Sequence, residues 1–203
     1  GMTITDLVFP AFLFIVGIAV PFALGGRLRR GQSRLEAWRH VVTRSLALVV
    51  MGVLMVNAEH GVGGVLSPPV WNVLMTLGVL LAWGVPDEGW GRLRKPWLRA
   101  TGVALLVFVA LAYRGVDATG FIQLRPYWWG ILGLIGWAYL GVATLYLWVG
   151  DRPAVLTGLI GLYGCIALAD AAGGFGWPAI PGPIVGPIVG THGATVLAGT
   201  LLG

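Results

Sequence analysis

The stretch that decides the fold is LVFPAFLFIVGIAVPFALG at 7–25, followed directly by GRLRRGQSRLEAWRHVVTR at 26–44. The first part is an apolar run of the length that crosses a bilayer, which takes about 20 residues. The second part carries six arginines before the next apolar run begins. An apolar span bounded by a strongly basic connection is typical of a membrane helix that ends on the cytoplasmic side.

The basic residues alternate along the rest of the chain in the same sense. The connections at 26–44, 86–99 and 150–153 hold 11 of the 13 Lys and Arg residues, and the other connections hold only Arg114 and Arg125. This alternation follows the positive-inside rule of polytopic membrane proteins. It predicts that the N-terminus of this chain lies outside, that the Arg-rich connections are cytoplasmic, and that the protein is integral to the plasma (inner) membrane.

The hydropathy pattern predicts an all-α fold, a polytopic transmembrane helix bundle with about six full spans plus a truncated seventh. The expected helices are 7–25, 41–57, 70–86, 97–113, 128–149, 154–172 and 192–203. We interpret 1–203 as a single transmembrane domain and expect it to be incomplete at both ends. The Gly/Pro-rich connection 173–191, with PIVGPIVG at 183–190, is expected to form a re-entrant plug or a surface lid.

Composition excludes several classes of function. Charged residues make up 10% of the chain and mean hydropathy is +0.86, whereas soluble domains carry about 25% charged residues. The net charge of +5 is explained by topology, so no nucleic-acid partner is expected. The single cysteine, Cys165, allows no internal disulfide or CxxC motif. No sequence motif indicates a metal site or a nucleotide-binding loop.

Acid–base side chains gather on the predicted outer side. Asp6 opens the first expected helix, His60 follows the second, Asp170 lies near the end of the sixth, and His192 opens the seventh. Ionisable residues at membrane depth are costly and are often functional, so these four are the candidate catalytic residues. The alternatives are that Asp170 caps a helix or pairs with an arginine, and that each histidine is a solvated loop residue.

The inner side instead offers arginines. Arg30, Arg39 and Arg44 are candidates for binding an anionic cofactor, because guanidinium groups bind phosphate in a bidentate manner. The alternative is that these arginines only anchor the topology and attract anionic lipid.

Two of the expected helices carry a glycine at every third position, which leaves a stripe without side chains along one face. The glycines are at 130, 133 and 136 in one helix and at 158, 161 and 164 in the other. We interpret these stripes as close helix contacts, with room for a substrate arm as the alternative.

The first 24 residues, GMTITDLVFPAFLFIVGIAVPFAL, resemble a segment of the heparan-α-glucosaminide N-acetyltransferase-like integral-membrane acyltransferases. In that family a Gly-x-Thr-x-x-Asp-Leu-Val-Phe-Pro run opens a helix that continues Phe-x-Phe-Ile-x-Gly. The matching positions here are Gly1, Thr3, Asp6, Leu7, Val8, Phe9, Pro10, Phe12, Phe14, Ile15 and Gly17. The segment WWGILGLIGWAYL at 128–140 also looks like bacterial members of the family.

The resemblance implies a membrane acyltransferase that moves an acetyl group from cytosolic acetyl-CoA to an amino sugar or envelope glycan on the extracytoplasmic side. It implies a catalytic histidine a few residues before the Gly-x-Thr run, a position that would precede Gly1. Asp6 is the family position carried over to this chain, and it would orient that histidine or the acceptor. Unless the upstream histidine is present, His60 or His192 has to replace it. Membrane lipid and the glycan acceptor are the expected partners, and a homo-oligomer is left open.

Two other interpretations stay open at the level of sequence. One is a polytopic transporter or flippase-like protein, in which Asp170 and the outer polar residues line a substrate path. No paired interruption of helices at corresponding positions is visible, although that is the usual mark of such transporters. The other is a non-catalytic membrane partner.

Overall fold

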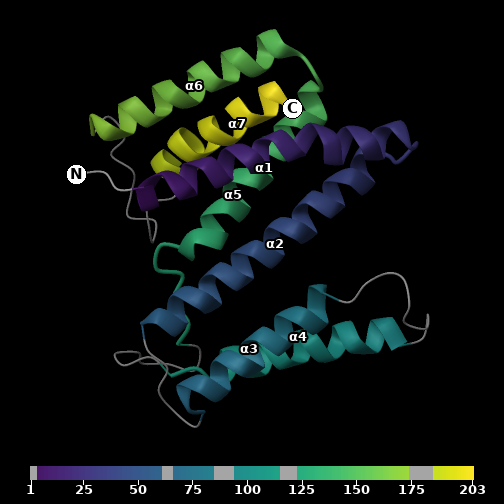
Figure 1. The fold of residues 1–203 in the computed structure, drawn as a ribbon, viewed down its shortest axis with the longest axis vertical. Coiled ribbons are helices and arrows are strands. Elements are labelled where there is room, and N and C mark those ends of the chain that lie inside the picture. Colours follow the sequence, from purple (N-terminus) through teal and green to yellow (C-terminus); the bar gives the residue numbers. More distant parts are fainter. Residues whose placement is uncertain (1–3, 61–65, 85–93, 115–122, 174–184) are drawn as a thin grey trace. The chain divides into compact units, whose positions relative to one another are not determined.

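The computed structural model describes residues 4–60, 66–84, 94–114, 123–173 and 185–203. Helices are the only regular elements within these ranges. They are α1 (Ile4–Arg29), α2 (Arg34–Glu59), α3 (Pro68–Trp83), α4 (Arg94–Ala112), α5 (Gly130–Val149), α6 (Pro153–Ala171), the π-helical segment η1 (Val185–His192) and α7 (Gly193–Leu202) (Figure 1). The predicted all-α membrane bundle is confirmed.

Four of these helices, α1, α2, α5 and α6, are long and apolar enough to cross a membrane, by length and composition. The other apolar helices, α3, α4 and the continuous stretch from η1 into α7, are shorter. Each of the seven expected helices is present. Most of the differences lie at the ends, where α1 and α2 extend into the connection predicted at 26–44.

That connection is short because both of its ends carry strong local signals. At the end of α1, Gly31 adopts φ 82°, its N–H donates to the Leu28 carbonyl at 3.0 Å and the Gln32 N–H donates to the Arg27 carbonyl at 3.2 Å. This pair of bonds is a Schellman motif, which ends a helix with a left-handed glycine. At the start of α2, the Ser33 N–H donates to Glu36 Oε2 at 2.8 Å and the Glu36 N–H donates to Ser33 Oγ at 3.2 Å. These reciprocal bonds form a capping box.

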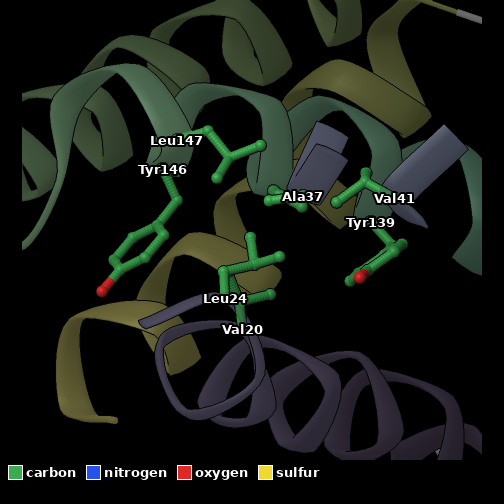
Figure 2. Close-up of a cluster of buried hydrophobic side chains, with 8 residues drawn as sticks. Val20, Leu24, Ala37, Val41, Tyr139, Tyr146 and Leu147 are labelled. Atoms are coloured by element: carbon green, nitrogen blue, oxygen red, sulfur yellow. The ribbon is translucent and has the colours of Figure 1, made fainter. Parts of the chain in front are cut away.

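The chain folds into two compact units, residues 1–49 with 131–203, and residues 50–130. The first unit has a buried cluster to which α1, α2 and α5 contribute, and Figure 2 shows its side chains converging. Its members are Val20, Leu24, Ala37, Val41, Tyr139, Ala143, Tyr146 and Leu147. A second cluster in this unit joins α1, α5, α6 and α7 through Leu13, Ile135, Ala138, Val142, Leu156, Val196 and Leu197.

α1 and α7 cross in the first unit at unusually close range. A Cβ atom added to Gly17 would overlap the Val196 carbonyl oxygen, and one added to Gly199 would overlap the Phe14 carbonyl oxygen. The buried Thr200 hydroxyl lies 3.2 Å from the Gly17 carbonyl and 2.9 Å from that of Val196, so it can donate across the crossing or within α7. Small residues and hydroxyl bonds are the usual means by which membrane helices approach closely.

The second unit is built around a buried tryptophan. Trp71 of α3 is fully buried and its indole N–H donates to the Val109 carbonyl of α4 at 3.0 Å. Leu54, Ala82, Leu106, Val109 and Tyr113 complete this cluster. α3 and α4 lie side by side along their length (Figure 1).

The two glycine stripes behave differently. On α5, the space beside Gly130 is filled by the Gly52 carbonyl, and that beside Gly136 by Leu48 and the Ser45 carbonyl, as close packing requires. On α6, a Cβ atom at Gly158, Gly161 or Gly164 would meet nothing within 4 Å. The predicted close contact is therefore confirmed at Gly130 and Gly136 of α5, and it is absent at the three glycines of α6 within the described residues.

The α1–α7 crossing gives a test of stability. Gly17→Ala should lower the free energy of unfolding by about 1–3 kcal/mol, because its methyl group must displace the α7 backbone. Gly158→Ala is the matched control, with open space around it and a change expected within about 1 kcal/mol. Thermal unfolding in detergent micelles measures both. Equal melting temperatures for the two variants would contradict the close crossing.

Candidate functional site

His192 lies at the junction of η1 and α7, in the first unit. Its ring meets the ring of Phe9 from α1 edge to face, with the centroids 5.0 Å apart and the planes at 88°. Its Nδ1 atom is buried and has no hydrogen-bond partner among the residues that the structure describes. Buried polar atoms are nearly always paired, and π-helical turns occur often at functional sites. This histidine is therefore the strongest site candidate in the first unit.

The last turns of α6 cover the same junction. Gly193 has no room for a side chain because the ring of Tyr163 occupies that space, and Ala167 is in contact with Gly190. Asp170 is half-buried and follows Ala167 by three residues, so it lies one helical turn farther toward the end of α6. No hydrogen bond joins Asp170 to His192 in the described part of the chain.

Asp6 lies in the first turn of α1, three residues before Phe9. The start of α1, the end of α6 and the start of α7 meet at one end of the first unit (Figure 1). Three of the four predicted catalytic residues therefore gather there.

His60, the fourth candidate, lies in the second unit just after α2. Its Nδ1 is 2.7 Å from the Val56 carbonyl oxygen, and its ring stacks on Tyr127 with centroids 4.0 Å apart and planes at 11°. A carbonyl oxygen only accepts, so Nδ1 carries the proton and Nε2 presents a lone pair in the neutral ring. His60 is exposed. Its tautomer is thus the one that a general base with a free Nε2 needs.

A buried amide holds the segment that carries Tyr127. The Asn57 Nδ2 group donates to the Val53 and Arg125 carbonyls, both at 2.7 Å, and the Arg125 N–H donates to Asn57 Oδ1 at 3.1 Å. We call these hydrogen bonds between Asn57 and Arg125 the Asn57 clamp. Shortly after Arg125 in the sequence, Tyr127 and Trp129 have positive φ values of 44° and 71°. Non-glycine residues pay about 1–3 kcal/mol each for such conformations, and the surrounding contacts must hold them there.

Two of the arginines predicted to bind a cofactor, Arg30 just after α1 and Arg39 in the second turn of α2, lie at the end of the first unit opposite to His192 (Figure 1). The third, Arg44, lies farther along α2. Arg30, Arg39 and Arg44 are all exposed. Arg30 Nε donates to the Gly26 carbonyl at 3.0 Å. Arg39, which was expected before the second helix, lies inside α2, and Arg44 lies in α2 as expected. Their role in binding a cofactor stays a prediction.

Sequence reasoning placed Asn57 with His60 on the outer side, but it did not identify Asn57, Tyr127 or Phe9 as a site residue. The signal for Asn57 was present, since an amide within the apolar run VLMVNAE needs partners at that depth. Tyr127 and Phe9 could not be found, because aromatic residues at helix ends are typical of the membrane interface. Within the described residues, no group of three His, Cys, Asp or Glu side chains could hold a metal ion.

Comparison with known proteins gives two relatives. The chain is 38% identical over 85 residues to heparan-α-glucosaminide N-acetyltransferase of Mus musculus and 34% identical over 85 residues to that of Homo sapiens. Each match covers 42% of this chain, and the chain spans 12% of the length of each relative. No family model and no solved structure matches it. The resemblance predicted from the first segment is confirmed.

The Asn57 clamp gives a prediction for the second unit. Asn57→Ala leaves the backbone groups of Arg125 without partners and should lower the free energy of unfolding by about 1–3 kcal/mol. Asn72→Ala, at an exposed position of α3, is the control and should change it by less than about 0.5 kcal/mol. Thermal unfolding in micelles compares them. If both variants melt together, the clamp does not stabilise the fold.

Proposed function

We propose that this integral membrane protein, which resembles the heparan-α-glucosaminide N-acetyltransferase-like family, transfers an acetyl group across a bacterial plasma membrane. The donor is acetyl-CoA on the side of the arginines, and the acceptor is an amino sugar or envelope glycan on the other side. The supporting observation is that Asp6, on the helix that carries the family-like run, belongs to the same end of the first unit as Asp170 and His192 (Figure 1).

The chemistry requires a group that removes a proton. An amine attacks a thioester carbonyl only when it is uncharged. The new C–N bond forms as the C–S bond breaks, coenzyme A leaves as its thiolate, and a base must take up the amine proton. Acetyl-CoA supplies the acetyl group as a thioester when it is bound. Imidazole is suited to this proton transfer near neutral pH. We assign the role to His192, with Asp6 orienting the acceptor.

His192 is favoured over His60 because it shares its end of the first unit with the family-like position Asp6. His60 has a suitable tautomer but lies in the second unit. The two histidines therefore make distinct predictions for mutagenesis.

The opposite end of the first unit suits an anionic donor. Arg30 and Arg39 are exposed there and Arg44 is exposed farther along α2, and guanidinium groups are well matched to phosphate oxygens. The same end holds most of the basic residues on which the predicted orientation depends. The donor would thus be held at the cytoplasmic end, and the acceptor would bind at the extracytoplasmic end.

Sidedness is tested by cysteine labelling. With Cys165→Ala as background, a cysteine at Gln32, between α1 and α2, should react only with reagent that has entered the cell. A cysteine at Ser67, which begins α3, should react with impermeant maleimide from outside. Both positions are exposed. Labelling of both from the same side would contradict the orientation.

Acetyl transfer is tested in liposomes that contain the full-length protein. Labelled acetyl-CoA supplied on the side of the arginines should pass label to glucosamine on the other side. His192→Gln should reduce transfer by about 10²–10⁴-fold, the usual contribution of a general base. Asp6→Asn should reduce it by about 10²-fold through misplacement of the acceptor.

His40→Gln is the matched control, since His40 contacts Arg27 at the opposite end of this unit, with 3.2 Å between His40 Nε2 and Arg27 Nη2. It should retain transfer. Loss of transfer in His60→Gln with retention in His192→Gln would move the base to the second unit. Full transfer in Asp6→Asn would remove Asp6 from the site.

A further inference from the structure

A cavity of about 420 Å³ lies at the arginine-bearing end of the first unit, where α2 begins and α5 ends. Its lining residues are Arg34, Leu35, Trp38, Leu147 and Trp148. Small-molecule sites usually have volumes of about 300–1,000 Å³ and mostly apolar walls. The cavity is therefore large enough to hold a ligand, although none of its residues belongs to the proposed transfer site.

The walls of this cavity are apolar and uncovered. Trp148 is 76% exposed, Leu35 56% and Trp38 40%. Leu147 is buried and belongs to the cluster joining α1, α2 and α5, so the floor of the cavity is part of the core. The occupant must then be mainly apolar, because only contact with apolar atoms would cover these side chains favourably.

The rim of the cavity is cationic. Arg34 is the one charged residue among the lining residues and stands at the first position of α2. Arg29 and Arg30 precede it across the short turn and are exposed. The nearby Glu36 carboxylate is engaged by the Ser33 N–H at 2.8 Å and hydroxyl at 3.0 Å. At the α5 end, Asp151 and Arg152 follow in sequence and offset each other in charge.

We infer that this cavity, the α2–α5 groove, binds one anionic phospholipid, with an acyl chain against Trp38, Leu147 and Trp148 and its phosphate on Arg34. An apolar wall with a guanidinium at its end matches an acyl chain with a phosphate at its end. Coenzyme A fits less well, because its amide groups need polar partners that the apolar walls of the groove do not offer. This lipid site does not depend on the proposed acetyl transfer.

Native mass spectrometry of the detergent-solubilised full chain tests the site. Phosphatidylglycerol and phosphatidylcholine with identical acyl chains differ only in the headgroup. The unchanged protein should bind phosphatidylglycerol about fivefold more tightly, the gain expected from one basic residue near an anionic lipid. Arg34→Gln should abolish this preference. Trp148→Ala should weaken binding of both lipids equally.

Arg39→Gln is the matched control for charge. Arg39 lies five residues after Arg34 on the same helix, about 140° around its axis, and does not line the groove. Its replacement should leave the preference intact. Equal loss in Arg34→Gln and Arg39→Gln, or no preference in the unchanged protein, would overturn the proposal. Displacement of phosphatidylglycerol by coenzyme A would instead identify the groove as a coenzyme site.

Discussion

The close crossing of α1 and α7 is the contact on which the arrangement of the first unit depends. Gly17 and Gly199 let the two backbones approach until no further atom fits between them. The Thr200 hydroxyl lies within hydrogen-bond reach of the Gly17 carbonyl at this crossing. Since lipid offers no hydrophobic gain for helix association, such packing and polar contacts must provide it. The crossing fixes where Phe9 meets His192, and so brings together residues more than 180 positions apart in sequence.

The presence of each helix could be predicted well from the sequence, because a membrane span needs about 20 apolar residues and such a run is visible in the hydropathy pattern. The residues at which the helices begin and end were harder to predict. The stretch RLRRGQSRLEAW falls in the basic connection expected between the first two helices, yet arginine, leucine and glutamate are good helix formers. Ser33 and Glu36, three residues apart, match the sequence pattern of a capping box. Gly31 adopts the left-handed conformation that ends α1. Local hydrogen bonds, rather than charge, decide this turn.

The candidate residues could be chosen from the sequence, but their grouping could not. Asp6, His192 and Asp170 were expected on one side by topology, and they do share one end of the first unit. Which aromatic ring contacts each histidine depends on helix packing that no periodicity records. The glycines of α6 also show that packing depends on the fold. Gly158, Gly161 and Gly164 have the spacing of a packing surface, but a Cβ atom added to any of them would meet nothing within 4 Å. Spacing predicts which face is smooth, and only the fold decides whether a neighbour occupies it.

The π-helical turns of η1 affect the direction in which the His192 ring leaves the chain. A π-helix places more residues in each turn than an α-helix does, so each residue of η1 turns through a smaller angle than the roughly 100° of an α-helix. His192 is the last residue of this wider winding, and α7 begins at Gly193. The change of winding at this point sets the angle at which the imidazole meets the ring of Phe9.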